Sequence, residues 1–185
     1  MKTLILQGSP RKNGDTMMLV NEFLKHLEGE HKLIDTFYAN IKPCIDCRYC
    51  RKNPGCSIKD GMQEVYEYIL EADNILIASP LNFAELTGPL LSVSSRLQTY
   101  YCAEAFRKEK PVEKPKRGGI ILVGGGDGAT DTAVKTAKLV LHHMNMSKIF
   151  PAVISHNTDR VLPSDDEQAM ADAKRLANFF NEIER

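Results

Sequence analysis

Residues 3–29, TLILQGSPRKNGDTMMLVNEFLKHLEG, contain the pattern that decides the fold. They begin with the apolar run Thr3-Leu-Ile-Leu, continue through a polar loop from Gly8, and end in a segment with apolar residues at helical spacing, closed by Gly29. A continuous apolar run is typical of a strand buried on both faces, and the periodic segment behind it is typical of an amphipathic helix. The stretch predicts a strand, a loop and a helix, with the loop opening directly into the helix.

The same alternation of short apolar runs and amphipathic segments extends over the whole chain. We expect four further strands, at His31 to Phe37, Asn74 to Ser79, Gly119 to Val123 and Lys148 to Ile154. Helices are expected from about Asp60, from Thr87 to about Tyr101, around residues 134–144, and from a capping box at Ser164-Asp-Asp-Glu167 to about Ile183.

This succession of strands and helices predicts an α/β fold. Parallel neighbours need long right-handed crossovers, so five strand–helix units indicate a parallel sheet with helices on both faces, a three-layer sandwich. Pro151 in the last strand cannot donate a ladder hydrogen bond, which places that strand at an edge. The five-stranded order 2-1-3-4-5 of flavodoxin-like folds fits this constraint.

The composition is that of a globular protein with one domain. The chain has 185 residues, 24 Lys and Arg against 24 Asp and Glu, and 43% hydrophobic residues. This length suits one hydrophobic core, so we expect residues 1–185 to form one domain with a cysteine-rich insertion at about residues 42–60. Zero net charge gives no whole-molecule attraction to nucleic acid or to an anionic membrane, and we expect neither partner.

The beginning of the chain bears on its compartment. Its first ten residues hold only three consecutive apolar ones, whereas a secretory signal needs about 7–15. No stretch approaches the roughly 20 apolar residues of a membrane-spanning helix. We therefore expect a cytoplasmic protein, in which disulfides are rare and grouped cysteines more often bind metal or carry out redox chemistry.

In a sheet of this kind ligands bind beyond the carboxyl ends of the strands, so the loops after strands one, three and four form the candidate site. The first loop offers hydroxyl, amide and guanidinium groups from Ser9, Arg11, Asn13 and Thr16. Together with the N–H groups of the following helix, this set suits one terminal phosphate dianion. An ordinary turn with Thr16 as the helix cap is the alternative.

The other two loops suit a flat heterocycle. After the third strand, Pro80 stops the strand, and Asn82 and Phe83 project an amide and an aromatic ring at the sheet edge. After the fourth strand, Gly124-Gly-Gly-Asp-Gly128 has almost no side chains, so its backbone N–H groups can approach a planar ligand closely. A lone Phe is more often part of a core, but three ligand-compatible loops at one edge favour a bound ligand.

Four cysteines form the sharpest motif, Cys44-x2-Cys47-x2-Cys50-x5-Cys56. A zinc ribbon pairs two C-x-x-C knuckles roughly a dozen or more residues apart, and this segment is too compact for it. Three thiolates at three-residue intervals and a fourth one a short loop later suit a [4Fe–4S] cluster. Two alternatives stay open: four reduced thiols packed in a loop, and a redox dithiol, which the distance to the next helix makes the weaker of the two.

Charge is concentrated around this motif. Residues 42–60 hold five basic and two acidic residues, which would offset a thiolate-ligated cluster and attract an acidic electron carrier or the phosphate of NADPH. A solvated loop would have the same composition. Residues 107–117 hold six basic and two acidic residues, and we expect a solvated loop there. Cys102 lies outside the motif, and we expect it to be an ordinary packed cysteine.

Taken together, these motifs identify a family. Gly8-Ser-Pro-Arg-x-x-Gly-x-Thr, the four-cysteine run leading into Ile58-Lys-Asp-Gly-Met, Ser79-Pro-x-x-Phe and Gly124-Gly-Gly-x-Gly stand in the expected order over nearly the whole chain. The chain resembles the NADPH-dependent FMN reductase family of the flavodoxin-like superfamily, and within it the iron–sulfur flavoproteins. The resemblance implies a homodimer or homotetramer that binds FMN.

The resemblance also implies roles for individual residues. Ser9, Arg11, Asn13 and Thr16 would hold the FMN phosphate. The edge of the isoalloxazine would lie against Pro80, Leu81, Asn82, Phe83, Gly124, Gly125, Gly126, Asp127 and Gly128. A [4Fe–4S] cluster would be ligated by Cys44, Cys47, Cys50 and Cys56.

Three positions depart from the family pattern. Asp15 stands where relatives often carry Asn or Ser, and its carboxylate would repel a phosphate unless it turns away. Asn82 stands at a commonly aromatic position, which leaves the flavin face more open. Asp60-Gly61-Met62 replaces a common Asp-Asp-Met.

From these residues and this resemblance we expect an FMN-dependent oxidoreductase or electron-transfer flavoprotein, with NAD(P)H as a candidate co-substrate. Its partner would be a small-molecule acceptor or an acidic electron-carrier protein. No side chain is an obvious acid or base, because the cofactor carries this chemistry, and we assign no catalytic residue. Two alternatives are a cluster-free NAD(P)H-dependent FMN or quinone reductase and a non-catalytic flavin electron carrier.

Overall fold

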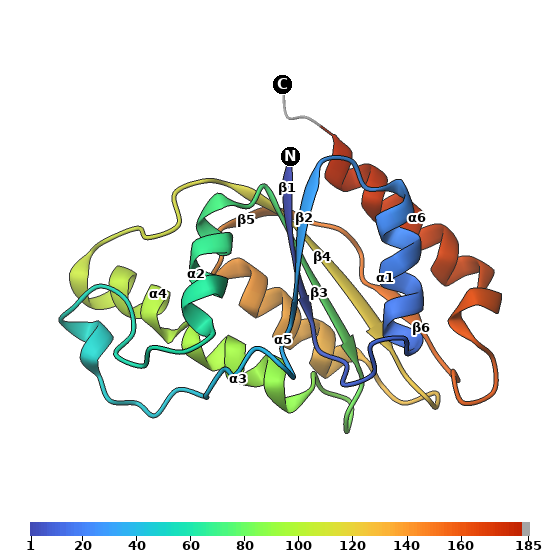
Figure 1. The fold of residues 1–185 in the computed structure, drawn as a ribbon, viewed down its shortest axis with the longest axis horizontal. Helices are drawn as coiled ribbons and strands as arrows, with labels where there is room; N and C mark the ends of the chain where they lie inside the picture. Colours follow the sequence, from blue (N-terminus) through green and yellow to red (C-terminus); the bar gives the residue numbers. More distant parts are fainter. Residues whose placement is uncertain (183–185) are drawn as a thin grey trace.

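A computed structural model, described over residues 1–182, contains one twisted sheet with helices on both faces (Figure 1). The strands are β1 Lys2–Gln7, β2 Glu30–Asp35, β3 Asn74–Pro80, β4 Lys116–Val123, β5 Met146–Ile149 and β6 Val153–Ser155. The α-helices are α1 Asp15–His26, α2 Met62–Glu71, α3 Gly88–Arg96, α4 Gln98–Cys102, α5 Asp131–His142 and α6 Glu167–Asn181. Three shorter helical turns are η1 Tyr49–Arg51, η2 Ala103–Arg107 and η3 Pro163–Asp165.

The strands are parallel and follow the order β2-β1-β3-β4-β5, which confirms the predicted α/β class and strand order. The predicted last strand is at the edge but is divided in two. β5 pairs with the first part of β4 and β6 with its last part, as Ile121 opposite Val153 shows. Pro151 lies between them, where its missing N–H would otherwise interrupt the ladder.

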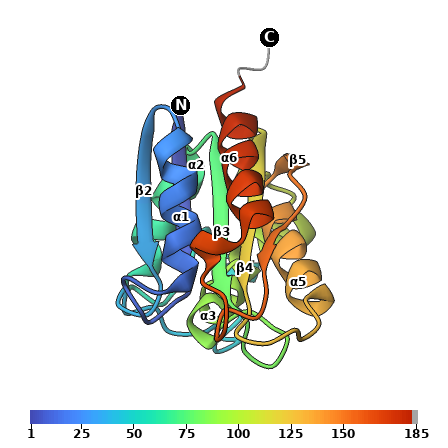
Figure 2. The same ribbon diagram turned by 90° about the vertical axis from the view of Figure 1, so that its right-hand side faces the viewer.

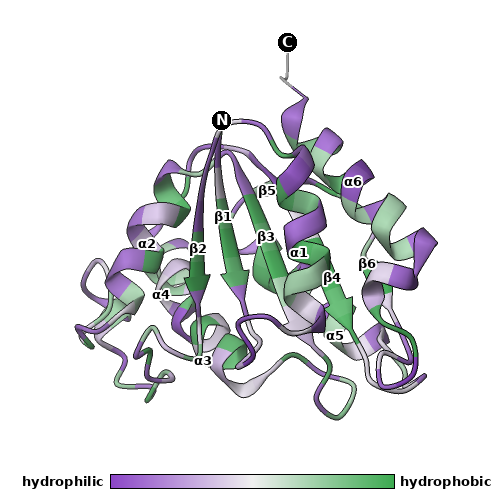
Figure 3. Cartoon of the chain, turned by 45° about the vertical axis from the view of Figure 1, so that its right-hand side comes forward, coloured by the Kyte–Doolittle hydropathy of each residue, from purple (hydrophilic) through white to green (hydrophobic). Residues whose placement is uncertain are grey.

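Helices cover both faces of the sheet, with α1 and α6 in front of it in Figure 2. Alternating side chains of the strands pack against these two helical layers. Leu4 and Leu6 of β1 face the core under α2, α3 and α5, whereas Ile5 faces the core under α1 and α6. Figure 3 shows the strands as the most continuous apolar part of the chain. Burial on both faces explains why β1, β3 and β4 appear in the sequence as unbroken apolar runs.

Four details differ from the sequence-based predictions. The predicted helix from Thr87 to Tyr101 is broken after Arg96, and α4 follows as a separate short helix. The capping box at Ser164 is wrong, because η3 occupies residues 163–165 and the carboxylate of Asp166 caps α6 by accepting from Ala169 N–H at 3.0 Å. The predicted helix end at Ile183 lies outside the described residues.

The fourth difference concerns the basic segment 107–117, which is not a solvated loop throughout. Lys116 and Arg117 belong to β4 and are 1% and 6% exposed. The Lys116 ammonium donates to the carbonyl oxygen of Ala72 at 2.7 Å, at the end of α2. A count of charges in the sequence does not reveal that these two side chains are buried.

Two regions beyond the sheet are important for the site. The loops after β1, β3 and β4 gather at the carboxyl edge, and the cysteine-rich segment between β2 and α2 extends to one side of the helical layer (Figure 1). Helix α3 begins behind the loop that follows β3 and runs toward the cysteine-rich segment. Within residues 1–182, none of the helices has the length and apolar character needed to cross a membrane.

Candidate functional site

The three predicted ligand loops start side by side. The first residue of each loop donates its N–H to a carbonyl oxygen of the neighbouring strand: Gly8 to Ala78 at 2.8 Å, Leu81 to Val123 at 2.8 Å, and Gly124 to Ser155 at 2.9 Å. Since these strands are parallel and in register, the hydrogen bonds fix the three loops at one edge. The structure therefore brings together the segments that the sequence predicted to share a site.

The loop after β1 presents its polar groups at the start of α1. Ser9 and Thr16 are each 2% exposed, and Arg11 N–H donates to Ser9 Oγ at 3.2 Å. Helix α1 has Gly14 as its N-cap, with no side-chain cap, so Thr16 is not the helix cap that the alternative interpretation required. N–H groups of the first turn remain without side-chain acceptors, which suits an anion.

Asp15 is paired rather than free. Its carboxylate lies 2.9 Å from the guanidinium of Arg11, and the Arg11 side chain is 69% exposed. The expected repulsion of a phosphate by Asp15 is therefore offset by an adjacent cation. Asn13 is exposed.

Gly8 places this loop directly against α3. A Cβ at Gly8 would fall 2.3 Å from Leu90 Cδ1 and 2.8 Å from Thr87 Oγ1. Any larger residue would push the loop away from α3, because the closest neighbours belong to the buried first turn of that helix. The glycine thus sets the separation between the first loop and the loop after β3.

The loop after β3 is a tight hairpin with a strained tip. Asn82 and Glu85 exchange backbone hydrogen bonds of 2.9 and 3.0 Å, and the two residues between them, Phe83 and Ala84, have φ of +50° and +60°. Positive φ at both positions is typical of type I′ turns, which favour Asn-Gly. Phe83 is fully exposed, so nothing in the core offsets this strain. The hairpin leaves the Phe83 ring exposed in a loop at the carboxyl edge of the sheet, where the sequence predicted it.

The glycine loop after β4 is fastened by its carbonyl groups. The oxygens of Gly124, Gly125 and Gly126 accept from N–H groups of residues 157–159 at 3.0 to 3.2 Å. Within residues 1–182, the N–H groups of Gly126 and Gly128 have no acceptor, and a Cβ at either glycine would meet open space. These two N–H groups are therefore available as donors, and the contact with a flat ligand stays a prediction.

Sequence reasoning missed residues 155–159, which support this loop. Gly125 packs so closely that a Cβ would fall 2.7 Å from the Asp159 carboxylate, and the buried Nδ1 of His156 has no partner in the described part of the chain. Their place in the sequence could have predicted them, because these residues follow the last strand and the carboxyl ends of parallel strands lie at the same edge of the sheet.

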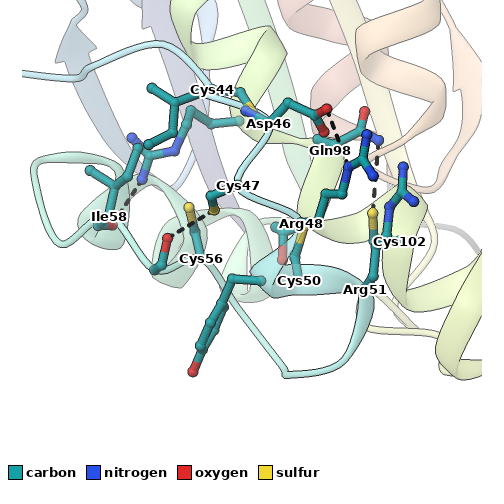
Figure 4. A pocket seen from close by; sticks show the side chains of 15 residues that line it. Cys44, Asp46, Cys47, Arg48, Cys50, Arg51, Cys56, Ile58, Gln98 and Cys102 are labelled. Carbon is teal, nitrogen blue, oxygen red and sulfur yellow. Dashed lines mark hydrogen bonds and ion pairs between the residues drawn. The ribbon is translucent and has the colours of Figure 1, made fainter.

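The cysteine motif lines one pocket, which Figure 4 shows from close by. Its four thiols come from one irregular segment, with Cys47 exposed and the other three half-buried. The pocket is lined by Cys44, Cys47, Cys50, Cys56 and, from α4, Cys102.

Two of the thiols have hydrogen-bond donors beside them. Asp46 N–H lies 3.4 Å from Cys44 Sγ, and Ser57 Oγ lies 3.1 Å from Cys47 Sγ. The Ser57 hydroxyl and the backbone N–H of Tyr49 hold the pKa of the Cys47 thiol below its ordinary value. Donors to sulfur stabilise the thiolate form, which is the form that binds metal.

Cys102 is buried, as expected, but it is not remote from the motif. It is 1% exposed and forms part of the same pocket wall. Burial, together with the hydrogen bond and charge of Cys102, raises the pKa of Cys50 to about 11. The fold therefore supplies a fifth thiol that the sequence spacing did not indicate.

The motif cysteines line one pocket, but their thiols do not have the geometry of a metal site. Among residues 1–182, no three Cys, His, Asp or Glu side chains already stand in the arrangement of a metal site. The type and number of donors nevertheless fit a [4Fe–4S] cluster, as do the hydrogen bonds to sulfur.

Arg96 at the end of α3 was also missed. Its side chain is fully buried and pairs with Asp60 at 2.8 Å, and it lines the cysteine pocket. Burial alone would raise the pKa of Asp60, but Arg96 and the N–H groups of Lys42 and Met62 outweigh it and lower that pKa. The sequence could have predicted that Arg96 is buried, because it follows Leu90 and Val93 at three-residue spacing, on the apolar face of the helix.

The chain is similar in sequence to known proteins. A model of the family described as NADPH-dependent FMN reductase matches residues 1–159. An iron-sulfur flavoprotein of Methanocaldococcus jannaschii is 33% identical over 141 residues, which cover 74% of this chain and 68% of the relative. A second iron-sulfur flavoprotein of that organism is 30% identical over 139 residues, covering 73% of this chain and 68% of the relative.

Solved structures share the fold. The NAD(P)H:quinone oxidoreductase from Methanothermobacter marburgensis gives a TM-score of 0.77 at 15% identity, covering 100% of this chain and 98% of that one. The FMN-dependent NADH-azoreductase from Bacillus anthracis str. Ames Ancestor, in complex with FMN, gives 0.66 at 12% identity, covering 98% and 99%. These likenesses, with the strand order, show a flavodoxin-like fold.

Proposed function

The chain belongs to the NADPH-dependent FMN reductase family of flavin-dependent oxidoreductases, and on that premise we propose that it combines an FMN site with a [4Fe–4S] cluster in the cysteine pocket. Electrons would pass between a reduced carrier and a small acceptor. The iron-sulfur flavoproteins among its relatives support the cluster by their names. In such a protein FMN supplies hydride and single-electron chemistry, and an iron–sulfur cluster supplies single-electron transfer.

The observation that carries the FMN part is the junction of three ligand-compatible loops at one sheet edge. Ser9, Thr16 and the first turn of α1 would hold the phosphate, with Arg11 sharing its charge between the phosphate and Asp15. The free N–H groups of Gly126 and Gly128 would donate to the polar edge of the isoalloxazine. Donors in this position stabilise negative charge that develops on the ring during reduction.

The hairpin would flank the same ring. Asn82 offers an amide at its base, and Phe83 offers an aromatic face whose exposure leaves it free to cover a planar ligand. Pro80 and Leu81 would form the floor between the hairpin and the glycine loop. These residues orient the ligand and exclude water from one side of it, and none of them is positioned as an acid or base.

The cluster part rests on the shared pocket of four motif thiols. Cys44, Cys47, Cys50 and Cys56 would be the ligands, with the donors from Asp46 and Ser57 lowering the charge density on sulfur. Exposed Lys42, Arg48 and Lys59 supply positive charge around the segment. Unpaired cysteines throughout the described chain fit a reducing compartment such as the cytoplasm.

One anaerobic preparation tests both cofactors. We expect bound FMN by chromatography of the released flavin, and about four iron and four sulfide ions per chain with broad absorbance that dithionite bleaches. Cys47→Ser and Cys56→Ser should lower iron content, whereas flavin content should stay unchanged. Full flavin loading with no iron or sulfide would refute the cluster, and iron without flavin would refute the FMN site.

A cluster-free NAD(P)H-dependent FMN or quinone reductase is the second candidate. The observation that favours it is that, within residues 1–182, no three thiols are close enough together to hold a metal ion. Steady-state NADPH oxidation with a quinone or free FMN in iron-free protein would support it. Absent turnover, with rapid flavin bleaching by reduced ferredoxin, would instead support a non-catalytic electron carrier.

The proposal extends to partners. An acidic electron-carrier protein would dock on the basic cysteine segment, and its association rate should fall steeply with ionic strength. We also propose a homodimer or homotetramer, because Tyr101, Phe106 and Leu139 are roughly half exposed, at 46, 50 and 59%. Sedimentation equilibrium of the flavin-loaded protein tests the oligomer, and a monomer at micromolar concentration would contradict it.

A further inference from the structure

Arg96 joins the two ends of the cysteine segment. From the last residue of α3, its Nη1 donates to the carbonyl oxygen of Lys42 at 2.8 Å, and its Nη2 donates to that of Ile58 at 3.0 Å. Lys42 precedes the first cysteine of the motif by two residues, and Ile58 follows the last by two. One side chain therefore closes the loop that contains all four motif cysteines.

Asp60 completes this closure. Its Oδ2 accepts from Arg96 Nη1 at 2.8 Å and from Lys42 N–H at 3.0 Å, and its Oδ1 accepts from Met62 N–H at 3.1 Å. The carboxylate thereby connects the beginning of the segment to the start of α2. Both charges are buried, so they are stable only while they remain together.

The guanidinium is also the buried charge of the cysteine pocket. Arg96 lines that pocket together with the motif cysteines, and its side chain is fully buried. Its Nε–H is buried and has no acceptor in the described part of the chain. A buried donor without a partner is unfavourable, so this N–H favours an acceptor in the pocket.

A second arginine touches the same loop in a different way. Arg107 of η2 donates to the carbonyl oxygen of Cys50, in the middle of the segment, and pairs with Glu109 at 2.8 Å. Ser95 of α3 accepts from Cys44 N–H at 3.0 Å and carries no charge. Only Arg96 among these three contacts both ends of the segment and leaves a donor unused.

Building on the proposed four-thiol metal site, we propose that Arg96 is its positioning residue. It holds both ends of the cysteine segment at a fixed separation, so the four thiols are restricted to one pocket before metal arrives. Its guanidinium, paired with Asp60, also forms part of the wall of that pocket. Because Arg96 belongs to α3, which begins behind the flavin-side hairpin, the same helix holds both sites in place.

Arg96→Lys tests the role, because lysine keeps the charge but cannot make the forked contacts to two carbonyl groups and a carboxylate. In metal-free protein, hydrogen exchange of amides 42–60 should become about 10-fold faster, with the amides of β1 and β3 unchanged. Arg175→Lys, an exposed arginine of α6, is the matched control and should match the wild type. Unchanged exchange in residues 42–60 of Arg96→Lys would overturn the proposal.

Metal affinity provides a readout that a purely structural role would not move. Reduced, metal-free protein is titrated anaerobically with Co²⁺, and thiolate-to-cobalt charge-transfer absorption is followed. We expect Arg96→Lys to bind Co²⁺ about 10–100-fold more weakly than the wild type and Arg175→Lys to bind it equally. If Arg96→Lys does not fold, Asp60→Asn should show the same weakening, because it releases the guanidinium from its partner.

The two possible failures are distinguishable. Equal Co²⁺ affinity in wild type, Arg96→Lys and Asp60→Asn would overturn the role of Arg96 while leaving the metal site intact. A wild-type protein without any thiolate–cobalt absorption would overturn the four-thiol site and, with it, this role.

Discussion

Asp60 and Arg96 form an ion pair with an N–O distance of 2.8 Å, and their side chains are 5% and 0% exposed. The pair lies where the cysteine segment joins the helical layer, between the start of α2 and the end of α3. Burial makes each charge depend on the other, so the pair fixes the geometry of the segment more than it adds to stability. The effect of this pair on the free energy of unfolding can be measured in protein without any cofactor.

Asp60→Asn should lower the free energy of unfolding by about 3 kcal/mol at pH 7, because it leaves Arg96 without its buried counter-charge. The native pKa of Asp60 is depressed, so its contribution is present above the unfolded pKa of about 3.9 and is lost as pH falls through the lower native value. Urea unfolding of both proteins between pH 7 and pH 3 measures this. A difference that does not shrink toward pH 3 would contradict the assignment.

Lys116→Met should change how stability depends on alkaline pH. Burial lowers the pKa of Lys116 to about 8, so between pH 8 and about 10.4 the unfolded state binds more protons and wild-type stability gains from this group as pH rises. We expect the wild type to gain roughly 3 kcal/mol relative to Lys116→Met over this range. Lys138→Met, which removes an exposed lysine of α5, should show no such divergence in denaturant titrations.

Thr16→Val should weaken FMN binding by about 10-fold, since it removes a hydroxyl donor to a charged phosphate, worth about 1.5–3 kcal/mol. Flavin fluorescence quenching by apoprotein measures the dissociation constant. Riboflavin, which lacks the phosphate, should bind equally well to Thr16→Val and wild type. Thr132→Val, at an exposed position of α5, is the control. Equal loss of FMN and riboflavin affinity would mean that the phosphate binds elsewhere.

Ala84→Gly should stabilise the apoprotein by roughly 0.5–1 kcal/mol, because glycine adopts the φ of +60° without the steric penalty that alanine incurs. Thermal unfolding by circular dichroism is the measurement. Ala84→Ser keeps the Cβ and should bring no gain. Equal stability of the alanine and glycine proteins would show that the hairpin tip is unstrained.

Cys102→Ala should lower the pKa of Cys50, because after burial the neighbouring Cys102 thiol is the main group that raises it. In metal-free protein, iodoacetamide should then modify Cys50 at lower pH than in the wild type, as followed by peptide mass spectrometry. The modification profile of Cys47, which is governed by Ser57, should not change. Unaltered labelling of Cys50 in Cys102→Ala would show that the Cys102 thiol does not raise the pKa of Cys50.

Local patterns predicted the elements and loops of this protein well. The unbroken apolar runs at β1, β3 and β4 require burial on both faces, and glycine and proline mark the loops that follow. Where tertiary packing competed with local preference, prediction was poorer. Asp166 rather than Ser164 caps α6, and Lys116 and Arg117 are buried in β4 within a stretch that composition marks as solvated.

The sequence by itself determined the parallel α/β sheet, the three loops at its carboxyl edge and the compact four-cysteine motif, because each depends on residues that are close together in the chain. Tertiary structure alone decided that Cys102 joins the cysteine pocket and that Arg96 closes its loop. Both contacts link residues about 50 positions apart. Their partners are set by how α3 and α4 pack, and neither periodicity nor spacing contains that information.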